Sequence, residues 1–235
     1  MPPIPCPEQK DKLSLLNYLL EFLTEERKNK FLTHILFRTR YLTIALEDIY
    51  QPHNASAVLR SCDCFGIQDV HIIENRNKYQ VNPDVALGAS KWLTLEKYSL
   101  PENNTISCLE NLKKKGYKVF ATTPHENDYT PESLPLENPV ALVFGNELEG
   151  LSDEALSMAD GFIKIPMVGF TESLNISVSA AVIVHTLSVR LRSSPIHWQL
   201  PEEARTEILL SWAMQSIKKP ELLSVEFFKR NFPIP

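Results

Sequence analysis

The sequence of 235 residues has no run of about 18 apolar residues, the length that a membrane-spanning helix requires. Near the N-terminus the stretch LSLLNYLL is only eight residues long and ends at Glu21. No small-residue cleavage site follows it, so we do not expect a signal peptide. An apolar content of 43% is enough to form a hydrophobic core. We therefore expect a folded cytoplasmic protein.

Cysteine is scarce, and no Cys-x-x-Cys pair occurs among the four cysteines. Two of them lie two positions apart on a predicted helix, where their side chains point to different faces and are badly placed to share a metal ion. The six histidines show no metal-ligand spacing such as His-Glu-x-x-His. We expect buried free thiols and no metal site; the cysteines are Cys6, Cys62, Cys64 and Cys108.

Basic charge is also in short supply, since the net charge is -5. Binding to nucleic-acid phosphates usually leaves a basic footprint, so this average argues weakly against a protein coated in nucleic acid. Residues 25 to 40 are an exception, with two acidic residues against Arg27, Lys28, Lys30, Arg38 and Arg40. Taken alone, this segment is also compatible with an ordinary solvated helix face.

The order of predicted elements indicates an α/β fold. Residues 8 to 38 have the pattern of two helices, the second capped by a Thr with Glu residues in its first turn. From Leu42 onward, short β-type runs alternate with helices, which predicts a parallel sheet covered by helices on both faces. After Pro195 the pattern returns to amphipathic helices. The predicted strands are LTIALEDI, DVHIIE, WLTLEKY, YKVFATT, PVALVFG and GFIKIP.

Glycine is rare as well, and four of the seven glycines fall within residues 145 to 169. In the segment VFGNELEGLSDEA, Gly145 follows a predicted strand and Ser152 is a candidate helix cap. Ligands bind outside the carboxyl ends of strands in open α/β sheets, so this loop is a candidate site. A plain β-α turn is the alternative. The sequence has neither Gly-x-Gly-x-x-Gly nor Gly-x-x-x-x-Gly-Lys, which excludes these dinucleotide and P-loop motifs.

A second glycine-containing loop, IPMVGFTESLNIS, leads into a helix that is apolar on almost every side. Thr171 and Ser173 are candidate caps for this helix. Asn175 lies at its start, where a buried amide needs a hydrogen-bond partner. Small residues in LNISVSAAVIVHTL allow a neighbour to approach closely, so we expect a deeply buried helix, against a second subunit or within the domain.

Three segments together resemble a known family. NASAVLRSCDCFG, FGNELEGLS and IPMVGFTESLNISVSAA are similar, in order and spacing, to the three motifs of the SPOUT-class RNA 2'-O-ribose methyltransferases, the TrmH family. The segment from 23 to 61 resembles the N-terminal arm of the tRNA guanosine-18 enzymes in particular. The similarity covers nearly all of residues 23 to 192, and the C-terminal helices match only in character.

The resemblance implies a deep trefoil knot around residues 140 to 180, a bent S-adenosyl-L-methionine bound within it, and an obligate homodimer. It also implies three parts of the chain: a helical RNA-binding extension over 1–40, the methyltransferase domain over 41–192 and a helical extension over 193–235.

By resemblance, Arg60 and Asn54 lie at the ribose 2'-hydroxyl and the adjacent phosphate. They lie six positions apart, roughly 240° around a helix, so they share a face only if Asn54 precedes the helix. The family pattern makes Arg60 the general base, but a guanidinium with a pKa above ~12 rarely gives up its proton. We therefore expect Arg60 to clamp the phosphate and polarise the oxygen, with the destination of the proton open. A salt bridge from Arg60 to Asp63 or Glu147 is the structural alternative.

Other site residues also come from the resemblance. Glu147 and Asn175 organise the site, and Ser173 matches a motif serine near the reactive centre, although helix capping explains it equally well. The expected cofactor contacts are Thr122, Gly145, Ile165 and Leu174. The expected phosphate-binding residues are Arg27, Arg38, Arg40 and His53, with Arg190 and Arg192 as weaker candidates. Two departures from the pattern are Phe170 in place of the common Met, in the pocket wall, and a one-residue shift of Arg190 and Arg192.

The expected reaction is methylation of guanosine 18 in the tRNA D-loop. One alternative is a related enzyme for ribosomal RNA or another tRNA position. The other is an RNA-binding protein that keeps the fold without catalysis, against which the intact Asn54, Arg60, Glu147 and Asn175 argue.

Overall fold

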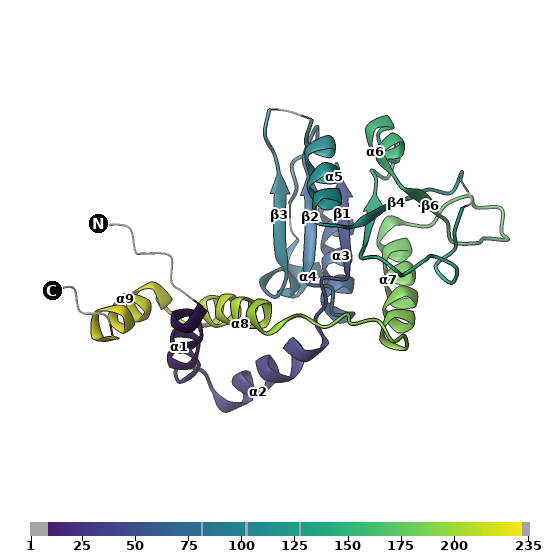
Figure 1. The fold of residues 1–235 in the computed structure, drawn as a ribbon. Coiled ribbons are helices and arrows are strands. Elements are labelled where there is room, and N and C mark those ends of the chain that lie inside the picture. Colours follow the sequence, from purple (N-terminus) through teal and green to yellow (C-terminus); the bar gives the residue numbers. More distant parts are fainter. Residues whose placement is uncertain (1–8, 81, 102, 127, 232–235) are drawn as a thin grey trace. The chain divides into compact units, whose positions relative to one another are not determined.

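The computed structural model describes residues 9–80, 82–101, 103–126 and 128–231. The chain divides into two compact units, of which one is Thr39–Trp198 and the other combines Met1–Arg38 with Gln199–Pro235. Figure 1 shows the ribbon of both units. The two terminal segments, expected as separate extensions, therefore belong to one unit, and the larger unit extends six residues beyond the expected end at 192.

The larger unit is built on a six-stranded sheet in the order β3-β2-β1-β5-β4-β6. All five strand pairings are parallel, as the alternation of strands and helices predicts. The central pair, β1 and β5, aligns Leu42 with Val140 and Leu46 with Phe144. The strands are β1 (Leu42–Glu47), β2 (Asp69–Ile73), β3 (Thr94–Tyr98), β4 (Lys118–Thr122), β5 (Val140–Phe144) and β6 (Gly161–Ile163).

Helices cover both faces of this sheet (Figure 1). Alternate residues of β1 and β5, such as Ile44 and Leu142, pack in a core with α3 (Pro52–Cys64) and α7 (Ile176–Arg192). The residues between them, such as Ala45 and Val143, pack in a second core with α5 (Asn104–Lys114) and α6 (Asp153–Met158). Strands buried on both faces explain the nearly continuous apolar runs of the sequence. The short helix α4 (Pro83–Ala86), which lies against α3, was not predicted.

Aromatic and leucine side chains form the core of the terminal unit. It contains α1 (Gln9–Leu20), α2 (Glu25–His34), α8 (Glu202–Ser216) and α9 (Pro220–Asn231). The rings of Phe31 and Trp212 lie 5.4 Å apart, as do those of Tyr18 and Phe227. Thr24 caps α2, as predicted, by accepting a hydrogen bond from the backbone N–H of Arg27 at 3.3 Å.

Cysteine burial follows the prediction only in part. Cys62 and Cys108 are buried free thiols, but Cys64 is exposed, because it lies two residues from Cys62 on α3 and so faces away from the core. Cys6 lies outside the described residues. None of the described helices has both the length and the hydropathy needed to cross a membrane. Over the same residues, no group of three or more His, Cys, Asp or Glu side chains is placed to hold a metal ion.

Candidate active site at the carboxyl ends of the strands

Two neighbouring cavities open at the carboxyl ends of the strands and share the loop from Asn146 to Leu151. The first, the motif cleft, has a volume of about 560 Å³. It is lined by residues from segments 122–125, 144–151, 163–167 and 173–183. Both glycine-containing loops singled out from the sequence therefore contribute to one cleft, where ligands of open α/β sheets bind.

Gly145 makes the loop after β5 possible. A Cβ atom at this position would lie 2.3 Å from the carbonyl carbon and oxygen of Gly150, far inside van der Waals contact. The loop closes through two backbone hydrogen bonds between Asn146 and Gly150, at 2.8 and 2.9 Å. Gly150 adopts a positive φ of 74°, a conformation that favours glycine. This turn brings the side chain of Glu147, two residues after Gly145, to the rim of the cleft.

Asn54, Glu147 and Asn175 form a chain of hydrogen bonds that connects all three motifs. The Asn175 amide donates to the Asn54 side-chain oxygen at 3.1 Å, and the Asn54 amide donates to Glu147 Oε1 at 2.7 Å. Glu147 Oε2 accepts from the backbone N–H of Tyr50 at 3.2 Å. Asn54 is buried, with 3% of its surface exposed, so its amide orientation is set by these partners.

Asn175, and not Ser173, caps α7. Its side-chain oxygen accepts from the backbone N–H of Ser177 at 2.8 Å, and α7 starts at the following residue. The candidate caps Thr171 and Ser173 were therefore wrong, because helical geometry begins only at Ile176, three residues after Ser173. Ser173 lines the motif cleft instead. Phe170, expected in the pocket wall, is fully exposed and is not among the residues that line this cleft.

Arg60 lies on a different face of α3 from Asn54. The helix begins at Pro52, so both residues are helical and the condition for a shared face is not met. Arg60 is exposed, and among the described residues no hydrogen bond or ion pair holds its side chain, neither with Asp63 nor with Glu147. The two side chains therefore do not share a face of α3: Asn54 is part of the hydrogen-bonded framework, and Arg60 projects into solvent.

The four expected cofactor contacts lie together. They come from the ends of β4, β5 and β6 and from the loop before α7, and all four line the motif cleft: Thr122, Gly145, Ile165 and Leu174. The Thr122 hydroxyl is used within the sheet, where it donates to the Val143 carbonyl at 2.9 Å. At this position the backbone is therefore the part left for a ligand.

The expected phosphate-binding residues differ in what they contact. Arg38 is 5% exposed and its guanidinium lies over the Trp212 ring, and Arg40 forms an ion pair with Asp69 at 3.0 Å. Arg190 donates to the carbonyls of Pro131 and Leu134, and Arg192 donates to the carbonyl of Phe65. Burial lowers the pKa of the Arg192 guanidinium. These four side chains have structural partners. Arg27 and His53 are exposed.

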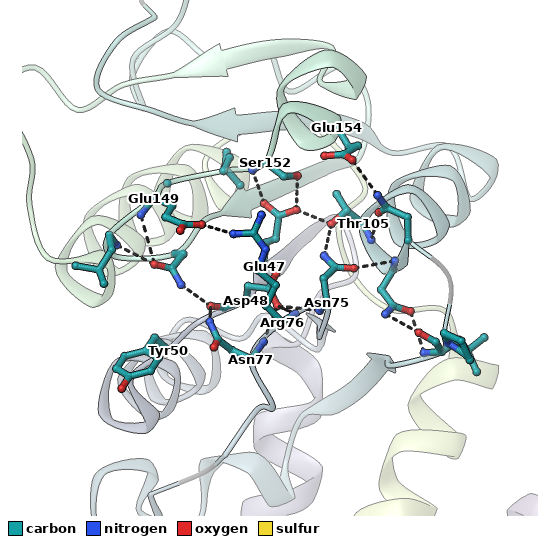
Figure 2. Close-up of a pocket in the computed structure, with 18 residues that line it drawn as sticks. Glu47, Asp48, Tyr50, Asn75, Arg76, Asn77, Thr105, Glu149, Ser152 and Glu154 are labelled. Atoms are coloured by element: carbon teal, nitrogen blue, oxygen red, sulfur yellow. Dashed lines mark hydrogen bonds and ion pairs between the residues drawn. The ribbon is translucent and has the colours of Figure 1, made fainter.

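The second cavity, of about 640 Å³, is lined largely by residues outside the three sequence motifs. We call it the amide cavity, because Asn75, Asn77, Asn103, Asn104 and Asn146 line it together with Glu47, Asp48, Tyr50, Arg76, Thr105, Glu149, Ser152 and Glu154 (Figure 2).

A buried carboxylate lies at the centre of the residues in Figure 2. Glu47 is 2% exposed and accepts from the hydroxyls of Thr105 and Ser152, at 2.5 and 2.6 Å, and from the backbone of Ser152 at 2.9 Å. Beside it, Asp48 Oδ1 accepts three backbone N–H groups from residues 75 to 77. The sequence signal for this polar cluster was a Glu at the end of a buried strand, because a buried carboxylate needs hydrogen-bond partners.

Comparison with known proteins decides the family. The model of the SpoU rRNA methylase family matches residues 41–185. The chain belongs to the SpoU methylase family. This confirms the TrmH-family resemblance, and the matched region coincides with the parallel sheet and its helices.

Two relatives and one solved structure extend the match beyond that region. The tRNA (guanosine(18)-2'-O)-methyltransferase of Borreliella burgdorferi is 41% identical over 213 residues, covering 91% of this chain and 96% of the relative. The enzyme of the same name from Thermus thermophilus is 34% identical, and the match covers 80% of this chain and 96% of the relative. The crystal structure of the A. aeolicus TrmH/SpoU tRNA modifying enzyme is 27% identical in sequence and has a TM-score of 0.68. The match covers 90% of this chain and 99% of that chain.

Proposed function

We propose that this protein transfers a methyl group from S-adenosyl-L-methionine to the 2'-hydroxyl of guanosine 18 in the D-loop of tRNA, in the cytoplasm. The observation that carries the proposal is the chain of hydrogen bonds from Asn175 through Asn54 to Glu147 at the rim of the motif cleft. Relatives named for this reaction match over most of their length, which supports the same activity here.

The motif cleft fits the cofactor in size and lining. Its volume of about 560 Å³ lies within the range of small-molecule sites, roughly 300 to 1,000 Å³. Apolar side chains such as Ile165 and Leu174 alternate with loop backbone, which suits an adenosine and a methionine moiety. When bound, the cofactor supplies an electrophilic methyl group on a positively charged sulfur. Thr122, Gly145, Ile165 and Leu174 hold it in this proposal.

Positioning of the ribose is the main task left to the protein. Well-oriented reactants can lower a barrier by about 7 to 11 kcal/mol. Glu147, fixed on both carboxylate oxygens by Asn54 and Tyr50, and Asn175 form the rigid side of the site. Arg60 binds the phosphate next to the target ribose and polarises the attacking oxygen, since a guanidinium stays charged at neutral pH. Ser173 lies near the reacting groups.

Exposed basic residues of each unit contact the RNA in this proposal. Arg27 on α2 and His53 at the start of α3 are exposed, and residues 25 to 40 carry the local basic excess. Phosphate contacts position an RNA without reading its sequence. Arg38, Arg40, Arg190 and Arg192 would have to leave structural partners to bind phosphate, so we place them outside the first contacts.

A homodimer and a trefoil knot complete the proposal. Val178, Val182 and Val189 are between 39% and 52% exposed and, with His185, form a stripe along α7. The opposite face of α7 packs against α3, so the three valines are exposed to a second copy, while the His185 ring lies against Phe65. The placement of β5 between β1 and β4, with α7 returning against α3, is compatible with a knot around residues 140 to 180.

The description of the matching family model, which refers to rRNA, supports a second candidate, methylation of ribosomal RNA. Methyl transfer from labelled cofactor separates the two. We expect transfer to tRNA transcripts with a guanosine in the D-loop, and none when that guanosine is replaced. Transfer to ribosomal RNA alone would refute the tRNA assignment.

Arg60→Ala tests the catalytic role of the arginine. Because Arg60 is exposed and does not line the motif cleft, the variant should lose turnover while cofactor affinity, measured by calorimetry, stays nearly unchanged. Arg60→Lys is the matched control, since it keeps the charge without the bidentate geometry. An active Arg60→Ala enzyme would contradict the placement.

A further inference from the structure

The amide cavity has no role in the mechanism above, although it shares a wall with the motif cleft. We propose that the amide cavity takes the guanine base of the nucleotide whose ribose is methylated, with Tyr50 stacking on the base and Glu149 reading its edge. This inference rests on the proposed function and adds to it the place where the base is recognised.

The location of the cavity fits a base attached to the reacting ribose. Glu147, at the rim of the motif cleft, accepts the backbone N–H of Tyr50, and Tyr50 lines the amide cavity. Asn146 and residues 148 to 151 line both cavities, whereas Glu147 lines only the motif cleft. A nucleotide whose sugar lies at Glu147 can therefore place its base on the other side of this shared loop.

Tyr50 has the properties of a stacking surface. Tyr50 is 65% exposed, while its backbone N–H is held by the Glu147 carboxylate. Within the described part of the chain, no aromatic ring packs against it. Figure 2 shows Tyr50 at the margin of the cluster of polar side chains. Proteins that bind unpaired RNA bases stack them on such rings.

The polar lining selects among the four bases. Guanine presents two adjacent donors on its Watson–Crick edge, N1–H and the N2 amino group, which match the two oxygens of a carboxylate. The Glu47 carboxylate already accepts three hydrogen bonds and Asp48 Oδ1 accepts three N–H groups. Glu149, in contrast to Glu47 and Asp48, can exchange its partner for a ligand, because it pairs with Arg76 and both side chains are about 70% exposed.

The exposed pair of Arg76 and Glu149 can open at little cost, because exposed ion pairs contribute little to stability. Figure 2 shows Arg76 pointing toward Glu149. An incoming guanine would replace Arg76 on the carboxylate, which leaves the guanidinium free for a backbone phosphate of the same RNA. The net acidic lining of the cavity argues against a phosphate as its deepest occupant and favours a base with donor groups.

Substitutions of Tyr50 test the stacking. Tyr50→Phe keeps the ring and should keep the KM for tRNA within about threefold. Tyr50→Leu keeps apolar bulk but no ring, and should raise that KM about tenfold or more, the lower part of what base stacking contributes. Cofactor affinity and the unfolding midpoint should be alike in both variants. Equal KM values for the Leu and Phe variants would refute the stacking.

Inosine at position 18 tests the carboxylate, because inosine lacks the N2 amino group of guanosine. We expect the wild-type enzyme to prefer guanosine over inosine by about tenfold in kcat/KM, and Glu149→Ala to lose this preference. Arg76→Ala is the matched control, since it removes the same ion pair but keeps the carboxylate, and it should retain the preference.

The outcomes separate this inference from the proposed function. A wild-type enzyme that methylates no tRNA would refute the function itself. A wild-type enzyme that methylates guanosine 18 but treats inosine equally, or a Glu149→Ala variant that keeps the full preference, would refute only the recognition of guanine in the amide cavity.

Discussion

Removing the Asn54 side chain should damage both the stability and the activity of this protein. Asn54→Ala deletes the bond to the Glu147 carboxylate at 2.7 Å and the bond from Asn175 at 3.1 Å. A hydrogen bond to a charged group contributes about 1.5 to 3 kcal/mol and a neutral one about 0.5 to 1.5 kcal/mol. Glu147 is half-buried and Asn175 is exposed, so water replaces part of this loss. We expect the free energy of unfolding to fall by about 2 kcal/mol.

The matched control for Asn54 is Ser56, two residues further along α3. Its hydroxyl is fully buried, donates to the Pro52 carbonyl at 2.6 Å and accepts from the backbone N–H of Asn82 at 2.7 Å. Ser56→Ala should therefore cost a similar free energy, about 1 to 2 kcal/mol, without touching Glu147 or Asn175.

Urea unfolding and single-turnover methyl transfer measure the two effects separately. Asn54→Ala should slow turnover about 100-fold, because a misplaced reacting group can cost that much, whereas Ser56→Ala should stay within a few-fold of the wild type. If both variants lose activity equally, or if Asn54→Ala is as active as the wild type, the chain of hydrogen bonds does not position the site.

Three further predictions follow from single residues. Gly145→Ala should destabilise the protein and abolish cofactor binding, since a Cβ would lie 2.3 Å from Gly150. Gly169→Ala is the control, because a Cβ there would meet no atom within 4 Å, and it should unfold at the wild-type urea concentration. Equal unfolding midpoints for the two variants would refute this reasoning. Burial lowers the pKa of His71, so the unfolded chain binds more protons below about pH 6.5 and stability should fall as the pH drops from 7 to 5. His71→Gln should reduce the dependence of the unfolding free energy on pH, and an unchanged pH dependence would contradict the role of His71. Val182→Glu should convert the proposed dimer to monomers in sedimentation, and a persistent dimer would exclude the stripe on α7 as the interface.

The strands were predictable because their burial is local information. Runs such as VALVF are apolar throughout, which predicts a strand covered on both faces, and the structure has β5 buried in this way. The order of strands was not predictable from these runs. β5 lies beside β1 because of pairings between residues about 100 positions apart, such as Leu42 with Val140.

Helix caps show a similar limit. Thr24 and Ser152 were each the obvious polar residue before a helix, and both cap as expected. Before α7 three polar residues compete within five positions, and only the structure shows that Asn175 is the cap. Whether a side chain is buried also depends on the exact start of a helix, which is why the sequence could not decide whether Asn54 and Arg60 share a face.

Long-range polar partners were beyond sequence reasoning. An arginine has the same chemistry whether it binds a phosphate or a backbone carbonyl, so Arg190 and Arg192 could not be assigned to carbonyls before the loops at 131–134 and 65 were placed. The amide cavity is a similar case. Asp48 receives its three N–H groups from residues 27 to 29 positions away, and its own positive φ of 50° is invisible in the sequence.

Methyl transfer to a tRNA transcript with a single 2'-deoxyguanosine at position 18 tests the central claim most directly. The base, the neighbouring phosphates and the RNA fold remain, and only the proposed attacking oxygen is missing. We predict full transfer of labelled methyl to the guanosine transcript and none to the deoxyguanosine transcript. Equal labelling of the two transcripts would show that the methyl group goes to another atom and would contradict the account.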